Sequence, residues 1–85
     1  MPDLVVYGAD WCPDCRRSKR LLDRLAVPYA YRDVDAEPDA MTTMKALNGG
    51  RQSIPVVVLP DGRHLTEPSD PDLRAAVEDA GLLPG

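Results

Sequence analysis

Apolar and polar residues along the chain form a pattern that predicts four short strands and three helices. The continuous apolar run at residues 4–7 predicts a strand buried on both faces. A helix is expected to begin near Cys12, because Pro13 suits the first helical position, and to end before Val27 and Pro28. The residues at helical spacing that form its expected buried face are Cys15, Ser18, Leu21, Leu22 and Leu25.

A second strand and a second helix follow. Residues 29–34 are rich in β-forming types and predict a strand, which the first helix joins to the first strand in a right-handed βαβ unit. The next helix is expected from about Pro38 to the sequence Asn-Gly-Gly at 48–50, which tolerates positive φ angles.

The last third of the chain predicts a hairpin and a final helix. Residues 56–59 and 63–66 form the expected strands around a turn at 60–62. The helix is expected to start near residues 69–71 and to end at Gly81. The order β-α-β-α-β-β-α therefore predicts an α/β fold, a four-stranded mixed sheet flanked by three helices.

Length, composition and charge narrow the class of protein. Eighty-five residues suit one domain, residues 1–85, and 44% apolar with 28% charged residues is typical of a folded globular protein. The net charge of −4 argues against a nucleic-acid partner, and no apolar run approaches the roughly 20 residues that span a bilayer. The start, Met-Pro-Asp-Leu, lacks the features of a signal peptide. We expect a cytoplasmic monomer, without membrane partners, whose thiols stay reduced.

The only two cysteines lie in Cys12-Pro13-Asp14-Cys15, where the first strand is expected to lead into the first helix. Ligands of open α/β sheets bind at this kind of position. A helix N-terminus stabilises a thiolate, which is the nucleophilic form, so Cys12 suits an attacking role with its sulfur facing solvent. Cys15, three residues later, falls on the inner face within reach of Cys12. The motif favours a redox-active dithiol.

Two structural uses of the cysteines compete with the redox interpretation. A zinc site needs four ligands, and His64, expected on an exposed edge strand, is the only other usual nitrogen or sulfur ligand. A structural disulfide would close a loop of a few residues and remove little entropy from the unfolded chain. Ligand counting therefore predicts no metal site, and the motif implies no bound organic cofactor.

The surroundings of the dithiol allow two interpretations each. The first two turns of the expected helix carry four basic residues, Arg16, Arg17, Lys19 and Arg20. They form either a solvated helix face or a positive rim that favours the thiolate and guides an anionic partner, while Asp10 and Asp14 act against ionisation. Trp11 is either a substrate platform or a cover over the helix end. Met41 and Met44 are predicted to fill the core.

The stretch from Tyr7 to Cys15, the sequence QSIP at 52–55 and the element order together resemble the glutaredoxin family, within the thioredoxin fold. Residues 48–69, NGGRQSIPVVVLPDGRHLTEPS, are similar to its mycoredoxin branch. The resemblance implies that Cys12 is the nucleophile and Cys15 the resolving thiol. It also implies a cis bond before Pro55, which without the dithiol would be a proline at the start of a strand. The implied thiol-binding residues are Trp11, Pro13, Asp14, Ser53, Ile54, Pro55 and Thr66.

Two departures from the glutaredoxin pattern bear on the co-substrate. Asp14 stands where the family usually has a tyrosine, and Thr-Glu-Pro-Ser at 66–69 stands where the glutathione site usually has a Gly-Gly pair. Mycothiol, a cysteine-bearing pseudodisaccharide, is therefore expected in preference to glutathione. The expected reaction is reduction of protein mixed disulfides, in which Cys15 either takes no part or closes a disulfide with Cys12.

The expected partners are oxidised protein substrates, mycothiol and the reductase that regenerates mycothiol. Within the same enzyme class, the chain could instead be a redoxin recharged by thioredoxin reductase that supplies electrons to ribonucleotide reductase. A third hypothesis, from another class, is an adaptor that uses its dithiol only to sense redox state or to carry a metal.

Overall fold

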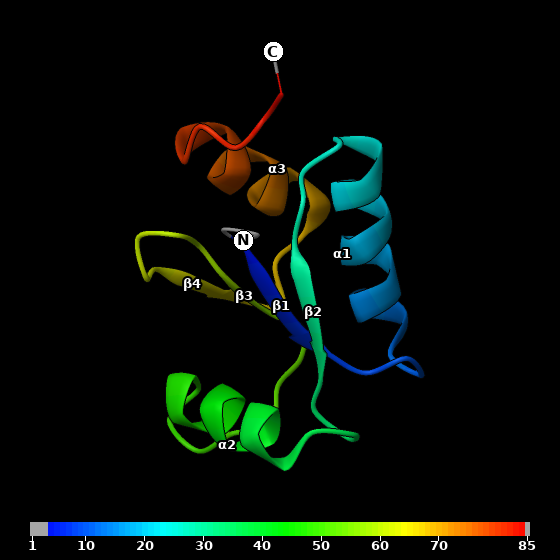
Figure 1. Cartoon of the computed structure of the whole chain (residues 1–85), viewed down its shortest axis with the longest axis vertical. Helices are drawn as coiled ribbons and strands as arrows, with labels where there is room; N and C mark the ends of the chain where they lie inside the picture. The colour runs from blue at the N-terminus through cyan, green and yellow to red at the C-terminus, as the bar shows by residue number, and fades with distance from the viewer. Residues whose placement is uncertain (1–3, 85) are drawn as a thin grey trace.

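Seven elements, in the order expected from the sequence, build an α/β domain in this computed structural model, which describes residues 4–84 (Figure 1). Along the chain they are β1 Val5–Gly8, α1 Pro13–Arg24, β2 Ala30–Asp33, α2 Pro38–Leu47, β3 Val56–Val58, β4 His64–Thr66 and α3 Asp70–Asp79. The strand order is β2-β1-β3-β4; β1 and β2 are parallel, and the other two pairs are antiparallel. The predicted mixed sheet with three helices is confirmed. The expected domain limits, residues 1 and 85, lie outside the described residues.

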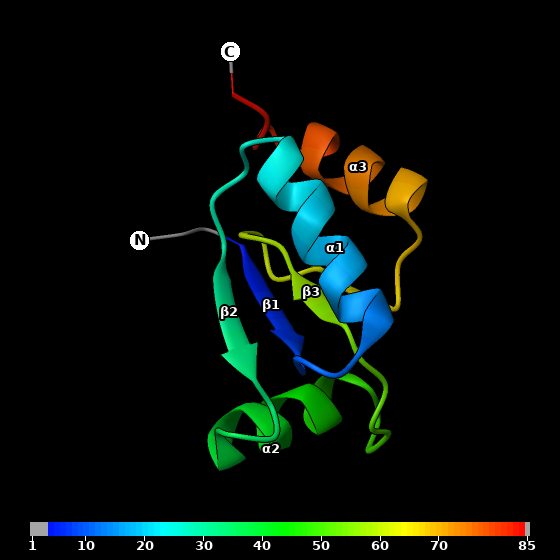
Figure 2. The ribbon, with the colours of Figure 1, turned by 90° about the vertical axis from the view of Figure 1, so that its right-hand side faces the viewer.

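Alternate residues of the central strands supply two separate hydrophobic cores, one on each face of the sheet. Leu4, Val6 and Val57 join buried residues of α1 and α3, whereas Tyr7 and Val56 join buried residues of α2. Successive side chains of a strand point to opposite faces, so a continuous apolar run serves both cores. Figures 1 and 2 show α1 and α3 together on one side of the sheet and α2 on the other. The prediction for residues 4–7 is confirmed.

Helix α1 ends before Val27 and Pro28, as the sequence predicts. Its last residue is Arg24 and its C-cap is Leu25. Ala26 adopts a left-handed conformation with a φ of 56°, and the N–H of Val27 donates to the carbonyl of Leu22 at 3.0 Å. This arrangement satisfies a carbonyl at the end of the helix and turns the chain toward β2.

The other elements differ from expectation by a residue or so at their ends. Both hairpin strands are one residue shorter at the turn, although the N–H of Leu59 still donates to the carbonyl of Arg63 at 2.8 Å. Helix α3 begins after Ser69, whose side chain accepts a hydrogen bond from the N–H of Asp72 at 3.3 Å. Within residues 4–84, no helix combines the length and the apolar character needed to cross a membrane.

Candidate active site

Cys12 is the N-cap residue of α1 and follows the turn that leaves β1. Its N–H donates to the carbonyl of Ala9 at 3.1 Å, and its Sγ accepts a hydrogen bond from the N–H of Cys15 at 3.3 Å. Pro13 occupies the first turn, where its missing N–H leaves no partner unsatisfied. The predicted position of Cys12 at the helix N-terminus is confirmed. A backbone N–H directed at a sulfur stabilises the thiolate form.

The Cys12 side chain is more enclosed than expected. Only 6% of the residue is exposed, because it packs against Ala9, Cys15 and Ile54. The expectation that its sulfur faces solvent is therefore wrong: Ile54, from the segment that precedes β3, lies against it. Sequence patterns near Cys12 cannot indicate this contact, which joins residues 42 positions apart. Cys12 still keeps an opening to solvent, whereas Cys15 is 0% exposed.

Cys15 lies on the inner face of α1, as predicted. Burial raises the pKa of its thiol to about 12, and the hydrogen bond with Cys12 acts in the same direction. The Cys15 thiol therefore holds its proton at neutral pH. Both cysteines are free thiols in this structure. Since the thiolate is the attacking form, the contrast between the two sites favours Cys12 as the first nucleophile.

Gly8, at the end of β1, provides the space into which Cys15 packs. A Cβ atom on Gly8 would lie 2.9 Å from Cys15 Sγ and 3.2 Å from Cε1 of Tyr31. Gly8 is not among the site residues predicted from the sequence. The signal that was available is its place at the end of a strand just before the dithiol, since a strand glycine often marks a close approach.

The Ile54–Pro55 peptide bond is cis, as the resemblance implied. Pro55 is buried, and its carbonyl accepts the N–H of Glu67 at 2.8 Å. The N–H and carbonyl of Ile54 make no hydrogen bond with another backbone group of residues 4–84. The backbone beside Cys12 therefore has a donor and an acceptor available for an extended ligand.

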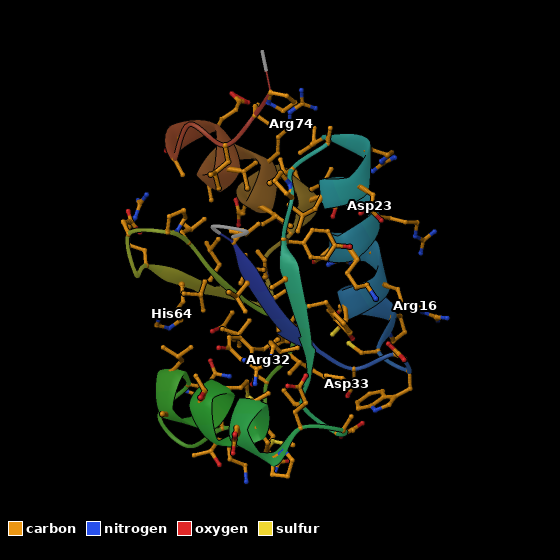
Figure 3. The ribbon with its side chains drawn as sticks, viewed as in Figure 1. Arg16, Asp23, Arg32, Asp33, His64 and Arg74 are labelled. Carbon is orange, nitrogen blue, oxygen red and sulfur yellow. The ribbon has the colours of Figure 1, made fainter. Side chains whose placement is uncertain are left out.

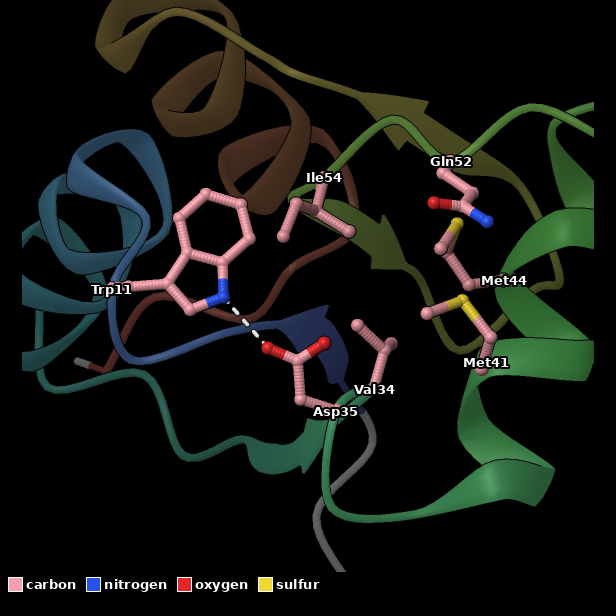
Figure 4. Close-up of a pocket in the computed structure, with 7 residues that line it drawn as sticks. All are labelled: Trp11, Val34, Asp35, Met41, Met44, Gln52 and Ile54. Atoms are coloured by element: carbon pink, nitrogen blue, oxygen red, sulfur yellow. Dashed lines mark hydrogen bonds between the residues drawn. The ribbon is translucent and has the colours of Figure 1, made fainter.

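Trp11, directly before the nucleophile, borders a pocket shown in Figure 4. The indole is 68% exposed, and its N–H donates to the Asp35 carboxylate at 2.6 Å. The pocket has a volume of about 100 Å³ and is lined by Trp11, Val34, Asp35, Met41, Met44, Gln52 and Ile54. The exposed ring fits the platform interpretation of Trp11 rather than that of a helix cover. Met44 fills the core as predicted, but it and Met41 also line this pocket.

Ser53 and Thr66 meet at a second hollow, about 180 Å³, centred on Asn48. The Thr66 hydroxyl donates to Asn48 Oδ1 at 2.7 Å, and Asn48 Nδ2 donates to the Ser53 carbonyl at 2.8 Å. Arg51 completes the lining. Asn48 was predicted only to help end α2. Its bonds connect the end of α2 to the segment before Pro55 and to β4, and nothing local to Asn48 indicates them.

Asp14 and Pro13 lie at the start of α1, on the outside of the molecule. Asp14 pairs with Arg17 at 3.0 Å, and Arg17 also approaches Asp70, at the start of α3, at 3.3 Å. Arg17 is thus engaged with two carboxylates and links the beginnings of the two helices. Exposed ion pairs of this kind contribute little to stability, typically below about 1 kcal/mol each.

Three other basic residues of α1 line a shallow hollow on its outer face. Its lining residues are Arg16, Lys19, Arg20 and Asp23, and Figure 3 shows Arg16 projecting away from the sheet. Lys19 Nζ lies 3.8 Å from the centre of the Tyr31 ring, a cation–π contact. The positions of these basic residues fit both earlier interpretations, a solvated helix face and a positive rim that guides an anionic partner.

The zinc interpretation finds no ligand set in the described part of the chain. Among residues 4–84, no group of three or more His, Cys, Asp or Glu side chains is placed to hold a metal ion. His64 is exposed on the edge strand β4, as predicted.

The geometry agrees with the outcome of comparisons with known proteins. The Glutaredoxin family model matches residues 4–65. The chain belongs to the glutaredoxin family. Mycoredoxin 1 from Corynebacterium glutamicum is 35% identical to it over 78 residues, which are 92% of this chain and 96% of that protein.

Solved glutaredoxins share the fold. The structure of buckwheat glutaredoxin in complex with glutathione is 27% identical, with a TM-score of 0.73, and the match covers 96% of this chain and 82% of that one. Glutaredoxin from Archaeoglobus fulgidus has a TM-score of 0.76 at 24% identity, over 91% of this chain and 87% of that one.

Family membership establishes the class of reaction. This glutaredoxin-family chain is a thiol–disulfide oxidoreductase. The resemblance drawn from the sequence, including the likeness to mycoredoxins, is confirmed.

Proposed function

We propose that the chain reduces mixed disulfides between protein cysteines and mycothiol, with Cys12 as the nucleophile. The observation that carries the proposal is the position of Cys12 Sγ at the N-terminus of α1, where it accepts the N–H of Cys15. Cys15 is fully buried and keeps its proton, so it suits the later, resolving role.

The proposed cycle has two exchange steps. The Cys12 thiolate attacks the small-thiol sulfur of the mixed disulfide, and the substrate protein leaves as its thiolate. Cys12 then carries the small thiol as its own mixed disulfide. A second small-thiol thiolate attacks that adduct, restores the Cys12 thiolate and leaves as part of the oxidised, disulfide-linked thiol. When Cys15 attacks instead, the small thiol leaves as a thiol and a Cys12–Cys15 disulfide forms.

Two observations support mycothiol over glutathione. The chain is 35% identical to a mycoredoxin over nearly its whole length. It also lacks the usual Gly-Gly pair: Pro68 has no N–H, and the N–H of Glu67 already donates to the Pro55 carbonyl at 2.8 Å. Residues 67 and 68 therefore offer no free backbone N–H to a γ-glutamyl group.

The test uses Cys15→Ser, which traps the adduct on Cys12. The variant is incubated separately with oxidised mycothiol and with oxidised glutathione, and its mass is measured. We expect the mycothiol adduct to form faster and no adduct on Cys12→Ser. An adduct from glutathione alone would overturn the choice of thiol. Disulfide reduction by Cys12→Ser would overturn the nucleophile and favour the adaptor hypothesis.

The reductant is tested in a coupled assay that follows NADPH consumption. We expect turnover with mycothiol and mycothiol reductase. Turnover with thioredoxin reductase alone would support the redoxin hypothesis instead, in which the Cys12–Cys15 disulfide is the species that is reduced.

A further inference from the structure

We infer that the pocket beside Trp11 selects a thiol whose far end is uncharged, and that Asp35 is the residue that rejects an anionic one. The inference rests on the proposed function, because the ligand is the small thiol carried on Cys12. It adds to that function a specificity-determining residue, Asp35, which lies in the turn after β2 and 23 positions after Cys12 in the sequence.

The pocket shares two of its lining residues with the surroundings of Cys12. Ile54 packs against Cys12 and also lines the pocket, and Trp11, which lines its other side, is bonded directly to Cys12. A group attached to the Cys12 sulfur therefore lies near these two side chains, and the pocket is within the part of the surface that such a group can cover. The pocket volume of about 100 Å³ is well above the space that one water needs, so the pocket can take one end of a small thiol.

The charge of the pocket comes from one residue. Its lining contains the Asp35 carboxylate, the Gln52 amide and apolar or sulfur-containing side chains, and no cation. The nearest arginine in sequence, Arg51, lines the hollow at Asn48 instead. Residues 51–54 thus alternate: 52 and 54 line the Trp11 pocket, while 51 and 53 line the other hollow. The Arg51 guanidinium is therefore not part of the pocket lining.

Asp35 is held in place at both its backbone and its side chain. Its N–H donates to Asp33 Oδ1 at 2.9 Å, and its Oδ2 accepts the Trp11 indole N–H at 2.6 Å. Its Oδ1 has no hydrogen-bond partner among residues 4–84. Figure 4 shows the two oxygens, one directed at the indole and the other on the side of Val34. The second oxygen is an acceptor available to a ligand hydroxyl.

This chemistry separates the two classes of small thiol. Glutathione ends in a glycine carboxylate without a compensating charge, whereas mycothiol is uncharged and rich in hydroxyl groups. A fixed carboxylate accepts hydrogen bonds from hydroxyls and repels a second carboxylate. Two like charges 4 Å apart in water repel enough to lower affinity about fivefold, and Trp11 offers an apolar face to a sugar ring.

The experiment compares three mixed disulfides of one cysteine peptide: with mycothiol, with glutathione, and with glutathione esterified at its glycine carboxylate. The measured quantity is kcat/KM for peptide release. For the unmodified protein we expect the ester to exceed glutathione about fivefold. With Asp35→Asn, the kcat/KM values for the glutathione ester and for glutathione should lie within about twofold of each other. With Asp35→Lys, the value for glutathione should exceed that for the ester.

Asp79→Asn and Asp79→Lys are the matched controls, because they change the same charge at the exposed last residue of α3, which does not line the pocket. They should keep the unmodified preference, and thermal unfolding verifies that all four variants fold. An ester-to-glutathione ratio that is unchanged in both Asp35 variants would overturn the inference while leaving the proposed function intact. If the unmodified protein released peptide from none of the three, the proposed function itself would fail, and the inference with it.

Discussion

Gly8 and Cys15 are in contact across the joint between β1 and α1, and the room for the Cys15 sulfur exists only because Gly8 has no side chain. An added Cβ would lie 2.9 Å from that sulfur. The position of the Cys15 thiol therefore depends on Gly8 of β1 as well as on helix α1.

Gly8→Ala should lower the free energy of unfolding by about 1 to 3 kcal/mol, because overpacking a tight core displaces neighbouring side chains. The measurement is urea unfolding of the reduced protein. In the Cys15→Ala background, Gly8→Ala should lower the free energy of unfolding by less, because the Cys15 sulfur is absent. Equal costs in both backgrounds would show that the sulfur is not the atom displaced.

The buried thiol predicts a loss of stability in alkaline solution. The pKa of Cys15 is raised from an ordinary value of 9.0 to about 12. Below pH 9 the thiol is protonated in both the folded and the unfolded states. Above pH 9 the unfolded state loses this proton first, so the stabilising contribution declines as the pH rises toward 12.

Urea unfolding of the reduced protein at pH 8 and at pH 10.5 tests this dependence. The unmodified protein should lose more stability between the two pH values than Cys15→Ala does. The variant keeps Tyr29, whose pKa burial also raises, so its contribution cancels in the comparison. The pKa of Tyr31 is raised by burial, by Asp10 and in part by Cys15, so the part due to Cys15 counts with the effect of the thiol.

Ala26→Gly should stabilise the protein by about 1 kcal/mol, because Ala26 has a φ of 56° and glycine adopts that region without a steric penalty. The midpoint of thermal unfolding should rise. Ala75→Gly is the control: this exposed residue lies inside α3, where the same substitution should destabilise by a similar amount. A fall in stability at both positions would contradict the left-handed turn.

Asn48→Ala should cost about 0.5 to 1.5 kcal/mol for each hydrogen bond lost and should weaken binding of the small thiol, because the segment before Pro55 loses its tie to α2. A double-mutant cycle with Thr66→Val isolates the 2.7 Å bond between the two side chains. Strictly additive effects on stability, with an unchanged KM for the mixed disulfide, would remove Asn48 from the site.

Much of the fold followed from local patterns in the sequence. The spacing of Cys15, Ser18 and Leu22 identified the buried face of α1, and Pro13 after Cys12 identified its start. Such features depend on neighbours within one or two turns, so they are visible in the sequence. The left-handed Ala26 was not predictable, because nothing in an alanine indicates a positive φ.

The candidate site was predictable only in part, because several of its contacts join distant segments. The pairing of Trp11 with Asp35 depends on the turn after β2, 24 positions away. The cover that Ile54 gives Cys12 depends on the arrangement of β3 beside β1. Sequence spacing located the reactive sulfur but not the residues that limit access to it.

Residues 51–54 alternate between two roles, because 51 and 53 line the hollow at Asn48 and 52 and 54 line the Trp11 pocket. Ser53 is tied to Asn48 on one side of the segment, and Gln52 and Ile54 contribute to the pocket on the other side. Replacing Gln52 can therefore change which molecules are accommodated without loosening the anchor next to it. This short stretch is a place where the protein's choice of thiol can be re-engineered, or can drift between related organisms, while the exchange chemistry at sulfur 12 stays the same.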